Sequence, residues 1–138
     1  MDTESFVSAL NEDLQTEYQS IVQYVNHVAT ISGAEFLSVI DELKVHLQQE
    51  LSHAQILAEQ VSFLGGSPTT DVAPVEAAQD NRGALVADLT LESRQLERYR
   101  ERFAQAHDLG LADVGEALRP LLEQTQEHVR DLQSALGE

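Results

Sequence analysis

Apolar residues recur at steps of three and four along several long segments of the chain, a period typical of amphipathic helices. The first segment runs from about residue 5 to residue 31, and its apolar positions are Phe6, Leu10, Leu14, Ile21, Val25 and Val28. The second runs from about residue 35 to residue 64 and ends at Gly65-Gly66. Because only the short Ser32-Gly33 segment separates them, we expect these two helices to form an antiparallel hairpin.

Residues 65–80 lack this period and contain two of the three prolines, so we expect a loop there. Fully extended, these sixteen residues would span roughly 50 Å, which is about the length of a 30-residue helix. The loop is therefore long enough to cross from one end of a helical bundle to the other. Asp80 or Asn81 can then cap a third helix over about residues 82–107.

The last periodic segment, residues 111–136, predicts a fourth helix after a break at residues 108–110. Pro120 lies inside this segment. A proline in a helix interior removes one backbone hydrogen bond, and we favour a kinked helix at this point. The alternative is a short helical turn followed by a helix that begins near Arg119. Together the four segments predict an all-α four-helix bundle that forms a single domain over residues 1–138.

Two polar residues of the second helix occupy positions where core side chains are expected. Glu50 and His53 are three residues apart, so they share one face of the helix and project toward the same point. An unpaired carboxylate in a core costs several kcal/mol or changes its protonation, and a bound metal ion would remove that cost. A pair with this spacing is more often an ordinary surface pair, but its place in the apolar face favours the metal interpretation.

The two halves of the chain repeat one spacing. Glu17 precedes Glu50 by 33 residues and His53 by 36 residues. The same two spacings link three residues of the second half: Glu92, Thr125 and His128. Helical bundles build dinuclear carboxylate sites from one glutamate on each of two helices and a Glu-x-x-His pair on each of the other two. We therefore expect Glu17, Glu50, His53, Glu92 and His128 to meet at one level of the core.

Other polar and aromatic residues admit simpler interpretations. Tyr24 and Tyr99 each follow the leading glutamate of their half by seven residues, and such tyrosines are more often core aromatics with a hydrogen-bonded hydroxyl than redox participants. We expect His27, His46 and His107 on solvated or interface faces and assign them no role. Four arginines are expected to form a solvated stripe that pairs with nearby acids: Arg94, Arg98, Arg100 and Arg102.

Composition narrows the classes of function. Apolar residues make up 42% of the 138 residues, which is enough for a buried core. The net charge of −16 argues against nonspecific nucleic-acid binding, which needs a basic surface, whereas an acidic surface attracts cations. Cysteine is absent, which excludes disulfides and thiolate metal sites. Neither a signal peptide nor a membrane-spanning run is visible, so we expect a cytoplasmic protein.

These segments together resemble the ferritin-like superfamily, and within it most closely the bacterioferritins. The resemblance covers nearly the whole chain, and its motifs are TEYQSIVQY around Glu17, ELSHAQ followed by FLGGSP, DLTLE ending at Glu92, and QEHVRDL around His128. It implies a ferritin-like up-down-down-up four-helix bundle with a long crossover between helices 2 and 3. It also implies that Glu17 and Glu92 are terminal metal ligands, that Glu50 bridges two metals, and that His53 and His128 are terminal nitrogen ligands.

The resemblance implies that Tyr24 is the tyrosine beside the dinuclear centre, and we take it as the catalytic candidate. The chain also departs from the bacterioferritin pattern. Thr125 occupies the place of the second bridging glutamate, and a neutral hydroxyl is a poorer ligand for a hard cation. Leu51 stands at the place of the haem-binding methionine, so we expect no haem. The sequence ends at Glu138 without the short fifth helix of those proteins, so we expect a dimer or a different cage as readily as a complete shell.

These observations favour a metal-binding protein that holds a di-iron site and oxidises Fe(II) with O2 or peroxide, as a ferroxidase does; manganese and zinc are possible substitutes. Its expected partners are metal ions, the oxidant and further copies of the chain in a homo-oligomer, with no nucleic acid and no membrane. Whether it is an enzyme stays open. The alternatives are a degenerate single-metal or metal-free bundle and a peroxide-consuming dimetal enzyme resembling rubrerythrins or manganese catalases.

Overall fold

Four helical rods lie side by side in the computed structural model, which describes residues 1–138 and contains no strand. The fourth rod is made of two consecutive helices. The elements are α1 (Thr3–Thr30), the 3-10 helix η1 (Ala34–Phe36), α2 (Leu37–Phe63), α3 (Asn81–Asp108), α4 (Ala112–Ala117) and α5 (Arg119–Ala135). The predicted all-α four-helix bundle is confirmed, and the helix ends lie within a few residues of the predicted ones.

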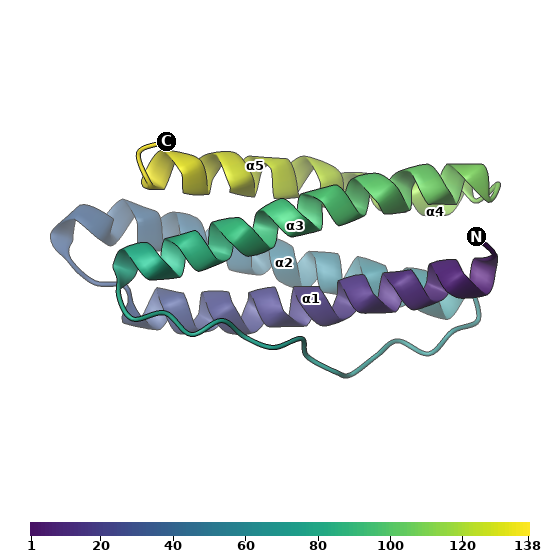
Figure 1. Ribbon diagram of the computed structural model, residues 1–138, viewed down its shortest axis with the longest axis horizontal. Helices are drawn as coiled ribbons and strands as arrows, with labels where there is room; N and C mark the ends of the chain where they lie inside the picture. Colours follow the sequence, from purple (N-terminus) through teal and green to yellow (C-terminus); the bar gives the residue numbers. More distant parts are fainter.

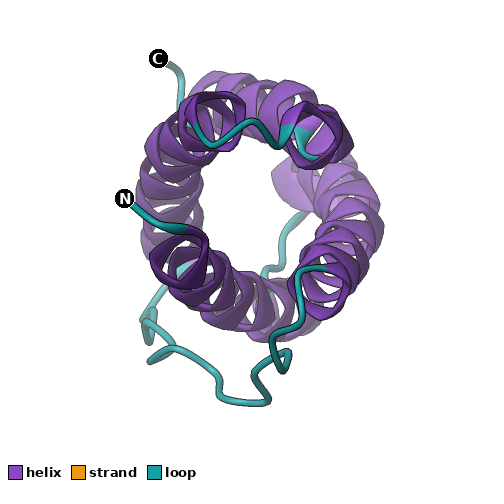
Figure 2. Ribbon diagram, turned by 90° about the vertical axis from the view of Figure 1, so that its right-hand side faces the viewer, coloured by secondary structure: helices purple, strands orange, loops and turns teal.

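The long loop between α2 and α3 sets the topology (Figure 1). α1 and α2 form an antiparallel hairpin, and α3 forms a second hairpin with the rod of α4 and α5. Between the hairpins, the loop runs from the end of α2, beside the N-terminus, back to the opposite end of the bundle. α2 and α3 therefore point in the same direction, and the helices follow the up-down-down-up order of the ferritin-like superfamily. In the end-on view the helices surround a common axis, with this loop outside them (Figure 2).

The crossover loop is tied to α1 along its length. Asn11 exchanges hydrogen bonds with the loop backbone, donating to the carbonyl of Ser67 at 3.0 Å and accepting from the amide of Thr69 at 2.9 Å. The hydroxyl of Tyr18 donates to the Thr69 carbonyl at 3.1 Å, and the amide of Ala73 donates to the Gln15 carbonyl at 3.1 Å. The loop thus satisfies backbone groups that would otherwise depend on water.

Pro120 does not kink a continuous helix. α4 ends at Ala117, Leu118 separates the two helices, and α5 begins at Arg119, so Pro120 lies in the first turn of α5. The expected kink is wrong, and the alternative of a short helical turn before a helix near Arg119 is correct. The physical reason is that amide groups in a first helical turn have no partner within the helix, so a proline there removes no hydrogen bond.

The core contains two apolar clusters with polar side chains between them. One cluster, which includes Leu10, Leu57 and Leu121, lies toward the N-terminus, and the other, which includes Leu43 and Leu85, lies toward the opposite end. None of the five predicted metal ligands belongs to either apolar cluster. None of the helices combines the length and the apolar character that crossing a membrane requires.

The buried face of α1 differs from the predicted apolar face in its second half. Val25 is 54% exposed, whereas Ser20, Gln23, Tyr24 and His27 are buried. The apolar period failed here because the inward face of α1 continues from Glu17 through polar residues, which pair with polar residues of α3. Ser20 and Gln23, for example, donate to Gln95 and Asp88, each at 3.2 Å.

The start of α3 fixes where the crossover loop ends, and Asp80 caps it by accepting a hydrogen bond from the Gly83 amide at 2.7 Å. Replacing Asp80 by Ala removes the acceptor, so we expect a loss of about 1 kcal/mol in the free energy of unfolding. Asp80→Asn keeps a side-chain acceptor and should lose much less. Urea unfolding followed by circular dichroism measures both variants, and equal losses would show that the cap does not stabilise the helix.

Candidate metal centre

Five side chains from four different rods meet between the two apolar clusters. They are Glu17 of α1, Glu50 and His53 of α2, Glu92 of α3 and His128 of α5, and we call them the central cluster. Each is at most 1% exposed. The structure therefore places the five residues expected from the spacing at one level of the bundle, turned inward.

The central cluster divides into two groups that share Glu50. In the first group, one atom each of Glu17, Glu50 and His53 lies within 4.8 Å of the others; in the second, the same holds for Glu50, Glu92 and His128. Ligands of a transition metal lie about 2.0–2.3 Å from the ion, so two ligands of one ion are at most about 4.6 Å apart, which is close to the separation within each group. The two groups could therefore hold two adjacent cations that share the Glu50 carboxylate.

Each histidine of the central cluster is oriented by a glutamine of the other hairpin. Nε2 of His53 lies 2.8 Å from the carboxamide oxygen of Gln124, and Nε2 of His128 lies 2.6 Å from that of Gln49. The carboxamide oxygens accept the Nε2 protons and leave Nδ1 of each ring facing the carboxylates. This is the tautomer in which a histidine can bind a cation through Nδ1.

Two tyrosines hold the outer glutamates in the same exchanged pattern. The hydroxyl of Tyr24, on α1, donates to Glu92 of α3 at 2.8 Å, and the hydroxyl of Tyr99, on α3, donates to Glu17 of α1. Both tyrosine side chains are buried. The two predicted tyrosines therefore do have hydrogen-bonded hydroxyls, and their partners are carboxylates of the central cluster.

Several buried polar atoms of this region have no hydrogen-bond partner. They are one oxygen of each of the three glutamates Glu17, Glu50 and Glu92, Nδ1 of His53, Oγ1 of Thr125 and Nε2 of Gln95. Leaving a buried polar group unpaired costs about 1–3 kcal/mol, and more for a charged one. Carboxylate oxygens and an imidazole nitrogen are suitable ligands for Fe, Mn or Zn, so cations bound at this level would satisfy most of these atoms.

The pKa values of two carboxyl groups in the cluster shift in opposite directions. Burial, and then repulsion from Glu17 and Glu92, raises the pKa of Glu50 well above its ordinary value. Burial also raises the pKa of Glu92, but hydrogen bonds with His128, Glu50 and Tyr24 outweigh that effect and lower this pKa to about 2. In the metal-free protein this environment favours the protonated form of Glu50, and a bound cation would replace that proton.

Thr125 holds, in the second half of the chain, the position that Glu50 holds in the first half. It is fully buried, it precedes His128 by one helical turn as Glu50 precedes His53, and its hydroxyl has no partner. The counterpart of the Glu50 carboxylate in the second half is therefore only the neutral hydroxyl of Thr125. This asymmetry limits the negative charge of the cluster to three carboxylates.

Other pairs exchanged between α1 and α3, which were not expected from the sequence, flank the cluster. Arg102 of α3 donates to Asp13 of α1 at 2.8 Å, and Nδ1 of His27, on α1, lies 2.8 Å from Asp88 of α3. All four residues are buried, so placing Arg102 in a solvated stripe and His27 on the surface was wrong. A comparison of the halves at their offset of 75 residues would have found these pairs, together with the glutamines: Asp13 and Asp88, His27 and Arg102, Gln49 and Gln124.

His46 is also buried, at 1% exposure, whereas His107 is exposed as expected. The ring of His46 stacks on that of His128, with centroids 4.0 Å apart and an interplanar angle of 24°. Its Nδ1 lies 3.3 Å from the hydroxyl of Tyr24. The expectation of a solvated or interface position was wrong for His46, because seven residues bring it to the same helical face as His53.

The raised pKa of Glu50 gives a test in the metal-free protein. The stability that its protonated form provides is fully present below the ordinary pKa of 4.5 and is lost as pH rises toward the folded-state pKa. Glu50→Gln cannot ionise, so above pH 5 its free energy of unfolding should exceed that of the wild type increasingly with pH, by about 1–3 kcal/mol at pH 8. Urea titrations in chelator at several pH values measure the difference, and a constant difference would contradict a protonated Glu50.

The chain is similar to known proteins over almost its whole length. Curated relatives are a bacterioferritin of Mycobacterium leprae (strain TN), 23% identical over 93% of this chain and 81% of that protein, and a bacterioferritin of Desulfovibrio desulfuricans, 23% identical over 89% of this chain and 69% of that protein. A crystal structure described as "ferritin like, diiron-carboxylate proteins" from Bacillus anthracis str. Ames superposes with a TM-score of 0.94 at 31% identity, covering 99% of this chain and 98% of that one. The family model of the ferritin-like domain matches residues 7–138, so the chain belongs to the ferritin-like family.

Proposed function

We propose that the central cluster binds two ferrous ions and promotes their oxidation by O2 or peroxide, the ferroxidase reaction. The observation that carries the proposal is the pair of three-residue groups joined by Glu50, whose buried carboxylate oxygens lack partners. The similarity to a structure described as a diiron-carboxylate protein supports iron over other metals. Manganese and zinc suit the same donor atoms and are the expected substitutes.

The residues have distinct roles in this proposal. Glu17 and His53 hold one ion, Glu92 and His128 hold the other, and Glu50 gives up its proton and bridges them. Each of the two ferrous ions loses one electron; dioxygen takes both electrons with two protons to give hydrogen peroxide, or peroxide takes them with two protons to give water. The apolar clusters on either side exclude bulk water and restrict access to small oxidants.

Tyr24 remains the tyrosine candidate of this site. Its hydroxyl lies 2.8 Å from Glu92, one of the proposed ligands. On this geometry it acts through Glu92 by fixing the direction of the carboxylate, which makes it a positioning residue. Tyr99 does the same for Glu17 in the other half.

Charge balance predicts that the second ion binds more weakly. Two ferrous ions bring four positive charges, whereas the central cluster supplies three carboxylates because Thr125 is neutral. A hydroxide, oxide or other external anion can supply the missing charge. Thr125 also favours a second candidate function, in which the bundle holds a single metal ion and does not turn over.

We infer a cytoplasmic homo-oligomer as the working form. Apolar side chains remain exposed on the outer faces of the first hairpin, among them Val22 and Val25 of α1 and Leu51 of α2. Such residues favour contact with another protein surface over contact with water. Leu51 carries no sulfur atom, so the proposal includes no thioether-bound haem.

Ferrous oxidation tests the main proposal. With two equivalents of Fe(II) per chain under air, we expect rapid formation of ferric iron, followed by its near-ultraviolet absorbance. In metal sites, loss of a residue that only hydrogen-bonds to a ligand lowers affinity or activity by ~10- to 100-fold. Glu92→Gln and Glu50→Gln each alter a proposed ligand itself, so each should slow the reaction by more than that. Glu59→Gln, on an exposed position of α2, is the matched control. If the wild type oxidises iron no faster than Glu50→Gln, the ferroxidase assignment is wrong.

Thr125→Glu separates the dinuclear and single-metal candidates. A glutamate at this buried position restores the fourth carboxylate, so the second Co(II) ion should bind at least ~10-fold more tightly than in the wild type, since one charge-assisted ligand is worth 1.4 kcal/mol or more. Calorimetric titration with Co(II) measures both steps. Thr125→Val serves as the control because it has a similar shape and no oxygen. Wild-type binding of two ions with equal, high affinity would show that Thr125 does not limit the site.

A further inference from the structure

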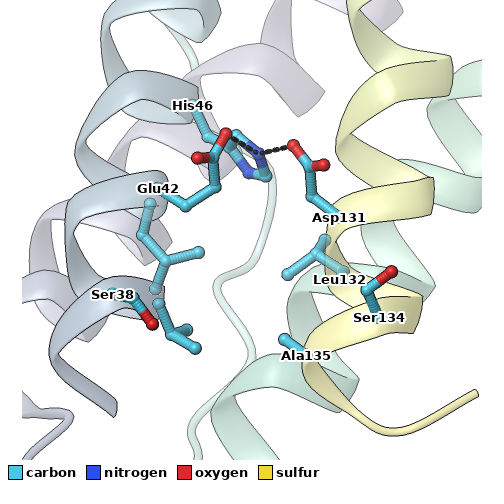
Figure 3. A pocket seen from close by; sticks show the side chains of 9 residues that line it. Ser38, Glu42, His46, Asp131, Leu132, Ser134 and Ala135 are labelled. Atoms are coloured by element: carbon cyan, nitrogen blue, oxygen red, sulfur yellow. Dashed lines mark hydrogen bonds and ion pairs between the residues drawn. The ribbon is translucent and has the colours of Figure 1, made fainter.

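A second group of metal-binding side chains lies outside the central cluster. Glu42 and His46 of α2 and Asp131 of α5 converge at a surface pocket of about 330 Å³, and we call them the outer cluster (Figure 3). Nε2 of His46 lies 3.0 Å from Asp131 and 3.8 Å from Glu42. The two carboxylates are about half exposed, whereas the imidazole is buried at the base of the pocket.

His46 supplies the buried nitrogen of the outer cluster. Its Nδ1 lies 3.3 Å from the hydroxyl of Tyr24 inside the bundle, whereas its Nε2 faces Asp131 and Glu42 at the pocket. One atom of each of these three residues lies within 4.8 Å of the others, so the three can surround a single cation. The imidazole would contribute a nitrogen ligand at the base of the pocket, and the two carboxylates would contribute oxygen ligands.

The internal repeat of the bundle does not account for the outer cluster. At the offset of 75 residues that relates the two hairpins, the residues equivalent to Glu42, His46 and Asp131 are apolar: Ala117, Leu121 and Ile56. Leu121 is the counterpart of His46 in the second half, and it is fully buried in the core. The same structural position is therefore filled well by a hydrocarbon side chain, and the polar residues of the first half are not needed for packing.

The position of the outer cluster connects solvent with the central cluster. None of the surface pockets is lined by any of the five residues of the central cluster. The outer pocket is linked to the central cluster through His46, which lines the pocket and also contacts Tyr24 and His128. An ion held by Nε2 of His46 would be one imidazole ring away from a proposed ligand of the dinuclear site.

We propose that Glu42, His46 and Asp131 form a third divalent-cation site, which captures Fe(II) from solvent before it passes to the central cluster. Two carboxylates balance the charge of one divalent ion, the imidazole supplies a nitrogen ligand, and water in the open pocket completes the coordination. The capture role rests on the proposed ferroxidase function, whereas the binding of a cation does not.

Anomalous diffraction from crystals soaked in Mn(II) tests the site directly. We expect a peak between Glu42, His46 and Asp131 in the wild type, and its loss in Asp131→Asn and Glu42→Gln with the peaks of the central cluster retained. Both substitutions are at partly exposed positions, so the bundle should fold. Asp41→Asn is the matched control, because it removes the same charge from an exposed neighbour of Glu42 that does not line the pocket.

Kinetics test the capture role. At limiting Fe(II), Asp131→Asn should oxidise iron at least tenfold more slowly than the wild type, whereas at saturating Fe(II) the two rates should agree within twofold. Equal slowing by Asp41→Asn and Asp131→Asn would overturn the capture role, because general surface charge would explain it.

The crystallographic outcomes separate this proposal from the proposed function. Peaks in the central cluster without one in the outer pocket overturn the third site and leave the ferroxidase proposal intact. A peak in the outer pocket without any in the central cluster supports the third site and contradicts the dinuclear one.

Discussion

Three carboxyl groups are buried between two apolar clusters, and each needs polar partners from other helices to offset the free energy that its burial costs. A bundle of this size could fill that level with leucine, as it fills the two flanking clusters, and gain stability without electrostatic cost. Instead the chain supplies partners from neighbouring helices to Glu17, Glu50 and Glu92, and it leaves one oxygen of each unpaired. The helices around this level are thereby fixed in register, because each carboxylate is paired with a residue of the opposite hairpin: Glu17 with Tyr99, Glu50 with His128, and Glu92 with Tyr24.

The overall fold could be predicted because its signals are local. Periodic apolar positions marked the helices, and the Gly-Gly pair and Asp80 marked two of their ends. Pro120 was misjudged because a helix interior and a first helical turn look alike in sequence; the difference lies in whether the chain is continuous at Leu118, which depends on how α4 packs against α3. Val25 was misjudged because the period counts only apolar residues, and the inward face of α1 changes to polar ones after Glu17.

The central cluster could be predicted from spacing because equal distances along two similar hairpins lead to one level. What surrounds it could not be predicted so directly. Asp13 and Arg102, for example, look like solvated charges until α1 and α3 are placed side by side. Only their mutual contact offsets the free energy lost when both charges are buried. The burial of His46 was not expected for a different reason: its counterpart in the other half, Leu121, is apolar, so the repeat of polar residues gives no sign of it.

Because the two hairpins exchange partners, a substitution in one hairpin alters the surroundings of a residue in the other. If two identical hairpins associated as separate chains, every substitution would appear twice, and a glutamate at position 50 would force one at position 125. The crossover loop, tied to α1 through Asn11, joins the hairpins covalently and releases them from that identity. In a fused chain one hairpin can keep Glu50 while the other carries Thr125, and an acidic pocket can form on one flank alone.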